Sequence, residues 1–125
     1  MARILIADDN EPFGALLKTL LEGHDGCSVC GVAKSGDEAV QKAVELKPDL
    51  ILLDIEMPKL DGLSACRLIR EKVPTSEVLI LTVYQSLDLA RVAAESGAWG
   101  YVSKNTISRD LIRAIEAMTS HNPRR

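Results

Sequence analysis

Residues 50–62 read LILLDIEMPKLDG, and this stretch decides how the rest of the sequence is interpreted. Four apolar residues lead directly into Asp54, and the turn-forming residues Pro58 and Gly62 follow. Unbroken apolarity over such a short run predicts a strand that is covered on both faces. A carboxylate at the end of a buried strand is costly unless it is paired or its charge is in use. The stretch therefore predicts a central strand that carries Asp54 to a site.

Apolar runs of the same kind recur along the chain, and each is followed by a segment with helical spacing. Asn10 is positioned to cap the first helix, with Pro12 in its first turn, and the fourth helix is expected at roughly 86–96. Five strand–helix units predict a flavodoxin-like, doubly wound α/β fold of the (βα)5 type. Its sheet has five parallel strands in the order 2-1-3-4-5. The predicted strands cover residues 3–7, 28–33, 50–53, 78–81 and 100–103.

Composition and charge narrow the class of protein. The chain has 125 residues, 46% of them hydrophobic, which suits one domain with one core. The net charge is −3, and basic residues adjoin only at Arg124 and Arg125, which argues against nucleic-acid binding by this domain alone. No apolar stretch is long enough to cross a bilayer, and the first residues lack a secretory signal pattern. We therefore expect a cytoplasmic protein without a membrane partner.

The three cysteines do not suggest a disulfide framework, because their number is odd. Cys27 and Cys30 have CxxC spacing, but an odd separation on a strand sends their side chains to opposite faces. We expect reduced thiols without a redox or metal role. The domain is expected to cover residues 1–119. Residues 120–125 are interpreted as a polar tail or as a truncated linker to an output domain that this chain lacks.

Reactive side chains follow four of the five predicted strands. Asp8 and Asp9 follow the first strand, Asp54 the third, Thr82 the fourth and Lys104 the fifth. In the strand order 2-1-3-4-5, ligands bind beyond the carboxyl ends at the switch between the first and third strands. Each residue also has an ordinary interpretation as a helix cap or a solvated charge. Three carboxylates in one crevice repel each other, however, and this predicts a Mg²⁺ site.

The same set favours phosphoryl transfer. A carboxylate can attack phosphorus and form an aspartyl phosphate, a reaction that needs alignment and charge neutralisation. In this hypothesis Asp54 attacks, Lys104 and the metal neutralise charge, and the Thr82 hydroxyl donates to a phosphoryl oxygen. The sequence contains no Ser-His-Asp arrangement, glycine-rich phosphate loop or zinc-ligand cluster that would indicate another chemistry.

These motifs, taken together and in this order, resemble the receiver domain of two-component response regulators. The resemblance covers residues 3 to about 118. The LTVY turn and the G-A-x-G-Y-x-x-K pattern are most similar to transcriptional regulators of the NarL/FixJ type, also called LuxR-type. The motifs are the DD pair at 8–9, D-x-x-M-P-x-x-D-G at 54–62, LT at 81–82 and GAWGYVSK at 97–104.

The resemblance implies a role for each motif residue. Asp54 would accept a phosphoryl group from a phosphohistidine on a partner sensor histidine kinase. Asp9 and Asp54 would bind Mg²⁺ directly, Asp8 would assist, and the backbone carbonyl of Glu56 would complete the protein ligands. Lys104 would pair with the phosphoryl group.

The resemblance also implies a switch. Thr82 would move toward the phosphoryl group, and Tyr101 would move inward. The readout surface would be the fourth helix, fifth strand and fifth helix, which would control a DNA-binding output partner or dimerisation. DNA would be reached only through an output domain outside this chain. The domain would catalyse its own phosphorylation and dephosphorylation without turning over an external substrate.

Several residues depart from the common pattern or are unusual in this chain. Asn105 follows Lys104 where many receivers have Pro, so a cis bond is not expected there. Tyr84 and Glu56 would flank the path of the hydrolytic water, and we predict that Tyr84 slows autodephosphorylation. Trp99 is interpreted as a partly buried space-filler or as an interface anchor. The apolar fourth helix supports a hypothesis of dimerisation on phosphorylation.

Three other interpretations remain open from the residues alone. An aspartyl-phosphate phosphohydrolase also has a second acid two residues after the nucleophile, but in this chain that acid is Glu56, not Asp, and Met57-Pro58 follows it. A flavin-binding module would want a phosphate-cradling loop after the first strand, where this chain has two carboxylates. A degenerate receiver would serve only as an interaction domain, and the complete set of acids, Thr82 and Lys104 argues against it.

Overall fold

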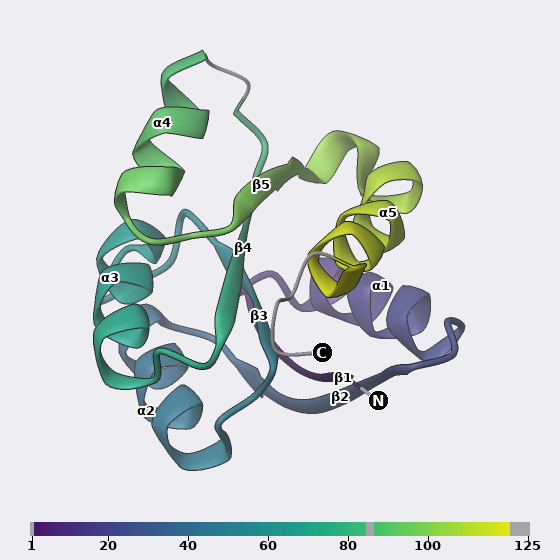
Figure 1. The fold of residues 1–125 in the computed structure, drawn as a ribbon, viewed down its shortest axis with the longest axis horizontal. Helices are drawn as coiled ribbons and strands as arrows, with labels where there is room; N and C mark the ends of the chain where they lie inside the picture. The colour runs from purple at the N-terminus through teal and green to yellow at the C-terminus, as the bar shows by residue number, and fades with distance from the viewer. Residues whose placement is uncertain (1, 85–86, 121–125) are drawn as a thin grey trace.

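The computed structural model describes residues 2–84 and 87–120 (Figure 1). Strands and helices alternate along the chain as the sequence predicts. Each observed strand lies within one residue of its predicted bounds, and β3 and β4 extend to include Asp54 and Thr82. The strands are β1 (Ala2–Ala7), β2 (Cys27–Ala33), β3 (Leu50–Asp54), β4 (Glu77–Thr82) and β5 (Gly100–Ser103). The helices are α1 (Glu11–Glu22), α2 (Gly36–Leu46), α3 (Gly62–Lys72), α4 (Leu87–Glu95), the short 3₁₀ helix η1 (Lys104–Thr106) and α5 (Ile107–Ser120).

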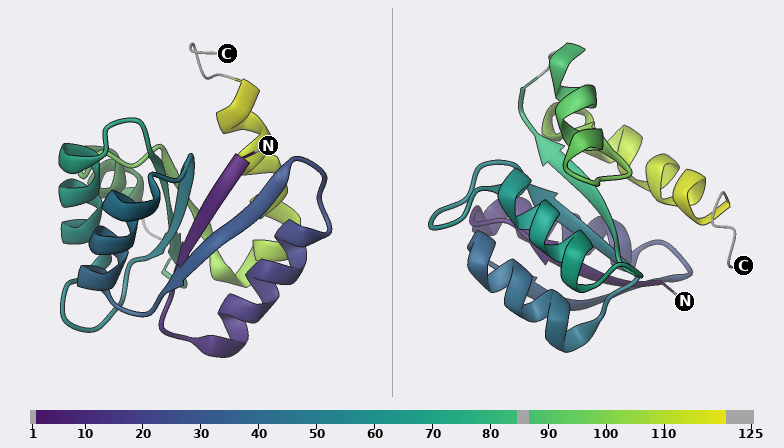
Figure 2. Two further views of the ribbon diagram at one scale, coloured as in Figure 1. Left: turned by 90° about the horizontal axis from the view of Figure 1, so that it is seen from below. Right: turned by 60° about the vertical axis from the view of Figure 1, so that its left-hand side comes forward.

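The five strands form one parallel sheet in the order β2-β1-β3-β4-β5, which confirms the predicted topology. Helices α1 and α5 cover one face of the sheet, and α2, α3 and α4 cover the other (Figure 2). Because β3 is the middle strand and lies between both layers, all five of its residues are buried. The order reverses between β1 and β3, so their carboxyl ends lie side by side at the crevice that the sequence predicts.

The core is aliphatic and divides into two layers, one on each face of the sheet. Along β1, Ile4 and Ile6 point into the layer under α1 and α5, and Leu5 and Ala7 point into the layer under α2, α3 and α4. This alternation along a strand buried on both faces explains why the sequence shows continuous apolar runs.

The loops at the carboxyl ends of the strands are held by caps and by close backbone contacts. The side chain of Asn10 accepts the backbone N–H of Phe13 at 2.9 Å and caps α1, as predicted. Asp61 caps α3 in the same way through Ser64. A Cβ on Gly62 would lie 2.2 Å from the carbonyl oxygen of Asp54, so only glycine allows α3 to begin this close to β3.

Cys27 and Cys30 lie on opposite faces of the sheet, as the sequence predicts. Cys27 packs against the layer under α1 and α5, and Cys30 packs against the opposite layer. Cys27, Cys30 and Cys66 are free thiols, and burial raises the pKa of Cys66 to about 11. One feature was not predicted: the pairing of β2 with β1 shifts register between Ile4 and Leu5, which forms a bulge at Cys30.

The C-terminal helix α5 continues to Ser120, one residue beyond the expected domain end. Residues 121–125, most of the expected tail, lie outside the described residues. Within the described part of the chain, none of the helices combines the length and apolarity needed to cross a bilayer.

Candidate functional site

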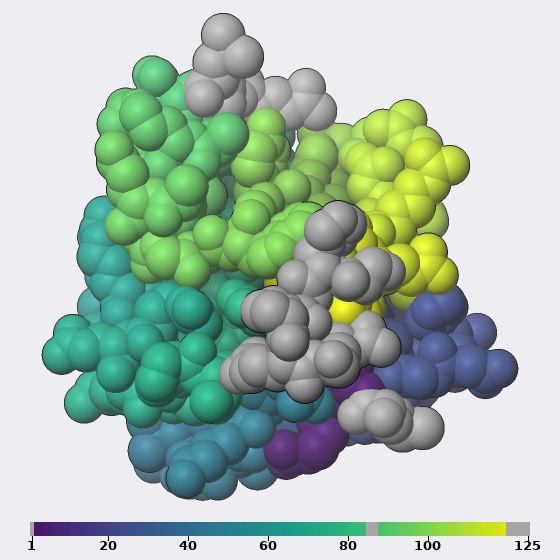
Figure 3. Space-filling model, viewed as in Figure 1, coloured from purple at the N-terminus to yellow at the C-terminus, as the bar shows by residue number. Residues whose placement is uncertain are grey.

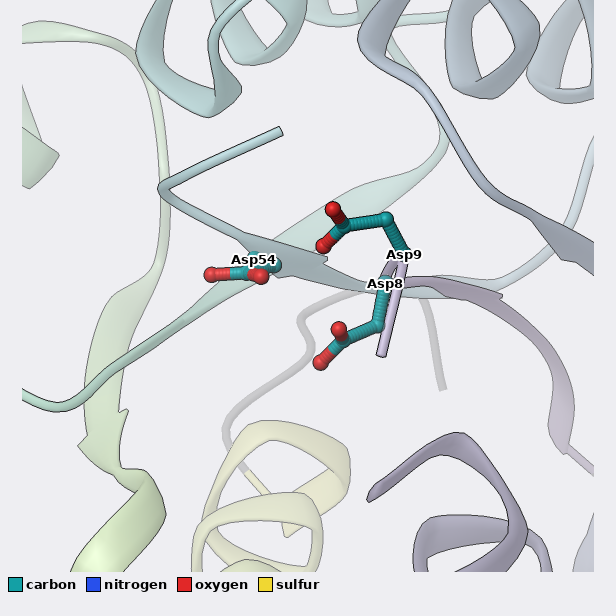
Figure 4. A group of neighbouring side chains, drawn as sticks. All are labelled: Asp8, Asp9 and Asp54. Carbon is teal, nitrogen blue, oxygen red and sulfur yellow. The ribbon is translucent and has the colours of Figure 1, made fainter. Parts of the chain in front are cut away.

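Three carboxylates meet where β1 and β3 end. Asp8 and Asp9 follow β1 directly, and Asp54 is the last residue of β3; Figure 4 shows the three side chains grouped at the ends of these strands. One carboxylate oxygen from each lies within 4.8 Å of the others. Asp8 and Asp54 are almost completely buried, with 2% and 5% of their surface exposed, whereas Asp9 is exposed. The structure therefore brings together the three acids that the sequence predicts.

Lys104 neutralises part of this charge. It begins η1 immediately after β5, and its ammonium Nζ lies 2.8 Å from Oδ2 of Asp8 and 3.2 Å from Oδ2 of Asp54. Its side chain is 13% exposed, so it has lost most of its contact with water. Two buried acids thus share one lysine, and the exposed Asp9 adds a third negative charge at the mouth.

The electrostatic state of Asp54 follows from this arrangement. Burial and the neighbouring Asp8 raise the pKa of Asp54 to about 6, against the lowering effects of the Glu56 backbone N–H and of Lys104. Burial alone would lower the pKa of Lys104, but its contacts with Asp8 and Asp54 outweigh burial and raise it. Lys104 is therefore charged at neutral pH, and Asp54 is a carboxylate that one lysine does not fully compensate.

The acid cluster fits a divalent cation. Oδ1 of Asp8 accepts the backbone N–H of Asn10 at 2.9 Å, but its buried Oδ2 receives no hydrogen bond of regular geometry, although Lys104 lies near it. A buried carboxylate oxygen left in this state keeps unused capacity to accept a hydrogen bond or to bind a cation. Together with Asp9 and Asp54 it offers oxygen ligands, which Mg²⁺ prefers. The residues present thus match the metal predicted from the sequence.

The mouth of the crevice is bordered by Thr82, Tyr84 and Glu56. Thr82 is buried at the end of β4, beside the strand of Asp54, and its hydroxyl oxygen accepts the backbone N–H of Tyr84 at 2.9 Å. The phenol of Tyr84 donates to Oε2 of Glu56 at 3.1 Å, so the two exposed side chains form a bridge. The backbone N–H of Glu56 donates to Oδ1 of Asp54 at 3.1 Å.

The remaining predicted residues lie outside the acid cluster. Tyr101 is half-buried on β5 and packs against the layer under α2, α3 and α4. Trp99 lies just before β5 and is 44% exposed, so other parts of the protein cover about half of its surface. On α4, Leu89 and Ala93 face the core, whereas Ala90, Ala94 and other residues face outward. The surface of α4 adjoins that of α3 in the space-filling view (Figure 3). The side chain of Leu87 lies outside the described residues.

Two features of the site were missed by reasoning from the sequence. Phe13 places its ring 4.6 Å from the ammonium of Lys104, measured to the ring centroid. The residue is the only Phe of the chain, and its place in the helix that follows Asp8 and Asp9 was the only signal that pointed to it. The hydrogen bond between Tyr84 and Glu56 was also not predicted. As expected, the chain has no cis peptide bond among the described residues, so the bond between Lys104 and Asn105 is trans.

Comparisons with known proteins agree with this geometry. Residues 4–116 match the family described as the response regulator receiver domain. The chain is 36% identical over 122 residues to the transcriptional regulatory protein LnrK of Bacillus subtilis strain 168, covering 98% of this chain and 54% of LnrK. It spans 37% to 57% of the length of curated relatives such as this one.

Solved structures give the same result. A two-component response regulator of the LuxR family from Aurantimonas sp. SI85-9A1 is similar with a TM-score of 0.91 and 33% identity, covering 96% of this chain and 86% of that one. The response regulator domain of CheB from Thermotoga maritima has a TM-score of 0.89 and 30% identity, covering 98% of this chain and 99% of that one. The similarity thus extends over nearly the whole chain.

Proposed function

The chain belongs to the response regulator receiver domain family of two-component signalling, and on this premise we propose that Asp54 is its phosphoryl acceptor. The donor is a phosphohistidine of a sensor histidine kinase. An oxygen of Asp54 forms a bond to phosphorus, the bond between phosphorus and the imidazole nitrogen breaks, and the imidazole leaves with its electron pair. The product is an aspartyl phosphate on this domain.

The observation that carries this proposal is the state of Asp54. It ends the central strand with only 5% of its surface exposed, and burial beside Asp8 raises its pKa to about 6. A buried carboxylate with incomplete compensation costs stability. A structural residue would be expected to have found complete pairing, so the arrangement is better explained by chemistry at this carboxylate.

Each neighbouring residue has a part in the proposal. Asp8, Asp9 and Asp54 would hold Mg²⁺ together with the backbone carbonyl of Glu56, and the metal, when bound, would supply positive charge to the acids and the phosphoryl group. Lys104, already 3.2 Å from Asp54, remains paired with the transferred group. The Thr82 hydroxyl, at the end of the adjacent strand, turns from Tyr84 to donate to a phosphoryl oxygen.

The switch and its readout are part of the same proposal. Movement of Thr82 draws Tyr101 inward, and the surface of α4, β5 and α5 changes. Similarity to LuxR-family and other transcriptional regulators favours a DNA-binding output domain, which lies outside this chain.

We assign the receiver unit to residues 1–119, with the following residues as a polar tail or linker, and we place the protein in the cytoplasm.

The bridge between Tyr84 and Glu56 is proposed to set the lifetime of the phosphoryl group. Because the phenol donates to the carboxylate across the mouth, water reaches Asp54 by a narrower path. Tyr84 therefore slows autodephosphorylation.

Dimerisation on phosphorylation is proposed through the face formed by α4 and β5. The half-exposed Trp99 and the outward alanines Ala90 and Ala94 give this face apolar contact area. On the same helix, the exposed charge of Arg91 is paired with Asp88 and Glu95. Sedimentation velocity with a bound phosphoryl mimic is expected to reveal a dimer. A sedimentation coefficient unchanged from that of the monomer would contradict it.

The direct test is incubation of the protein with Mg²⁺ and acetyl phosphate, followed by intact-mass measurement. The wild type is expected to gain one phosphoryl group, and Asp54→Asn is expected to gain none. An exposed acid remote from the crevice, Glu45, supplies a control, since Glu45→Gln should be modified as the wild type is. An unmodified wild type would leave a degenerate receiver as the better description.

A further inference from the structure

We propose that Phe13 is a positioning residue that holds the ammonium of Lys104 over the acidic crevice through a cation–π contact. This inference rests on the proposed function. The ring centroid lies 4.6 Å from Nζ of Lys104, within the range of about 6 Å over which an aromatic face attracts a cation. Phe13 is half-buried and Lys104 is 13% exposed, so the contact lies away from most of the solvent that would weaken it.

The position of the ring is fixed relative to the acids by a short relay of hydrogen bonds. Oδ1 of Asp8 accepts the backbone N–H of Asn10 at 2.9 Å, and Oδ1 of Asn10 accepts the backbone N–H of Phe13 at 2.9 Å. The ring also packs against the core layer under α1 and α5. The cap that begins α1 therefore fixes the positions of both the buried carboxylate of Asp8 and the ring of Phe13. Lys104 contacts both from η1, at the end of β5.

The ring differs from the other partners of Lys104 in one respect. The contacts of its ammonium within the described residues are with Asp8, Asp54 and Phe13. Asp8 and Asp54 are also the proposed metal ligands, so a divalent cation competes with Lys104 for their oxygens and repels its charge. The ring does not bind the metal. It continues to hold the ammonium in the crevice when the carboxylates are shared.

Without the ring, holding the Lys104 side chain in the crevice would cost more free energy. Its four-carbon stem is flexible and its ammonium is strongly hydrated, so the side chain tends to turn toward water. When the ammonium is already held near the phosphoryl group, the reaction does not need to bring the side chain back from the solvent. Loss of the ring is therefore expected to slow phosphorylation about threefold to tenfold, which corresponds to the usual strength of a partly desolvated cation–π contact.

The test uses the fact that Phe13 is the only phenylalanine of the chain. Biosynthetic replacement of phenylalanine by a polyfluorinated analogue changes this one ring, keeps its apolar shape and weakens the negative charge of its face. The fluorinated protein is expected to take phosphoryl from acetyl phosphate about threefold to tenfold more slowly than the wild type. Phe13→Tyr contains no phenylalanine, so the same growth conditions should leave its rate unchanged.

A double-mutant cycle separates positioning from packing. Phe13→Leu removes the π face, and it is expected to lower the folding equilibrium constant of the metal-free protein about threefold to tenfold more when Lys104 is present than in a Lys104→Met background. Phe13→Tyr and Phe13→Trp keep a π face and should preserve the phosphorylation rate. Leu20→Ala removes packing from the same helix and core layer, and its rate should equal that of the wild type.

The outcomes can be told apart. Two results would overturn the positioning role and leave the proposed function intact. One is an equal loss in the folding equilibrium constant for Phe13→Leu with and without Lys104. The other is an equal phosphorylation rate for the fluorinated and ordinary proteins. A wild type that gains no phosphoryl group would overturn the proposed function and the positioning role together. A larger loss in the folding equilibrium constant for Phe13→Leu when Lys104 is present, together with slower phosphorylation of the fluorinated protein, would support the positioning role.

Discussion

The two ends of the strands differ in how their charged groups are paired; we call them the amino edge, where the strands begin, and the carboxyl edge, where they finish. At the amino edge, where the strands begin, Asp49 accepts the backbone N–H of Arg3 at 2.8 Å, and the guanidinium of Arg3 donates to the carbonyls of Leu46 and Lys47 at 2.9 and 3.2 Å. At the carboxyl edge, two buried acids share Lys104, and one buried oxygen of Asp8 has no regular hydrogen bond.

The difference separates charge used for stability from charge kept for function. The amino edge uses its polar groups to close the ends of helices and strands, and this requires no ligand. The carboxyl edge leaves negative charge uncompensated, which lowers the stability of the metal-free protein and matches the proposed metal site. Variants at the two edges should therefore respond differently to metal and to pH.

The largest expected loss of stability comes from crowding the backbone beneath the crevice. Gly62→Ala would bring a Cβ to 2.2 Å from the carbonyl oxygen of Asp54, so β3 or α3 must shift. We expect a loss of about 3 kcal/mol or more in the free energy of unfolding, measured by urea denaturation. Gly100 begins β5 at the amino edge, and a Cβ there meets no atom within 4 Å. A loss for Gly100→Ala as large as that for Gly62→Ala would contradict the crowding explanation.

The next effect compares the two cationic side chains. Lys104→Gln leaves two buried acids without a counter-charge and is expected to cost about 2–4 kcal/mol at pH 7 without metal. Arg3→Gln removes contacts to exposed carbonyls and is expected to cost about 1 kcal/mol. Mg²⁺ should restore part of the first loss and none of the second. Equal responses of the two variants to Mg²⁺ in urea denaturation would remove the distinction between the edges.

The pH dependence of stability follows from the raised pKa of Asp54. The folded protein holds a proton on Asp54 up to about pH 6, whereas the unfolded chain releases it near 3.8. The favourable contribution is complete below the lower value and is lost as the pH rises through the upper one. Without metal, raising the pH from 4 to 7.5 should therefore destabilise the wild type relative to Asp54→Asn.

The size of this effect is expected to be about 1–2 kcal/mol, smaller than about 1.4 kcal/mol per pKa unit would give, because the crevice mouth is open to water. Urea denaturation of both proteins at the two pH values measures it. Saturating Mg²⁺ should stabilise the wild type more at pH 7.5 than at pH 5, since protons compete for Asp54. A wild type that gains stability relative to Asp54→Asn as the pH rises would contradict the assigned sign.

The smallest expected effect concerns the bridge at the mouth. Tyr84→Ala opens the path of water to the aspartyl phosphate and should shorten its lifetime about threefold. Tyr84→Phe keeps the ring but loses the hydrogen bond to Glu56, so its effect should be smaller. Decay of the phosphoryl adduct, followed by intact mass after removal of acetyl phosphate, gives both rates. Slower decay in Tyr84→Ala than in the wild type would reverse the proposed role.

The sequence predicts the fold and the acid cluster because both depend on simple regularities. Apolar runs alternate with helical spacing, and the carboxyl ends of parallel strands converge, so Asp8, Asp54 and Lys104 could be brought together without coordinates. The bulge at Cys30 left no signal in the apolar pattern, because both of its layers accept apolar side chains.

The side-chain contacts at the crevice could not be predicted for a different reason. The ring of Phe13 faces Lys104, and the phenol of Tyr84 reaches Glu56, only because rotamers are selected by packing between elements distant in the sequence. The sequence indicates which residues lie near the mouth. It does not indicate which pairs make contact, and those pairs carry the finer proposals on Lys104 and on phosphoryl lifetime.

The position of Trp99 has a practical consequence. It is the sole tryptophan of the chain, it is 44% exposed, and it immediately precedes β5, the strand that leads to Lys104. The domain therefore carries an intrinsic fluorophore at the start of β5, the strand that the proposed switch would move. Its emission wavelength and quenching by iodide provide a label-free optical signal with which the rearrangement of this strand can be timed in a stopped-flow instrument.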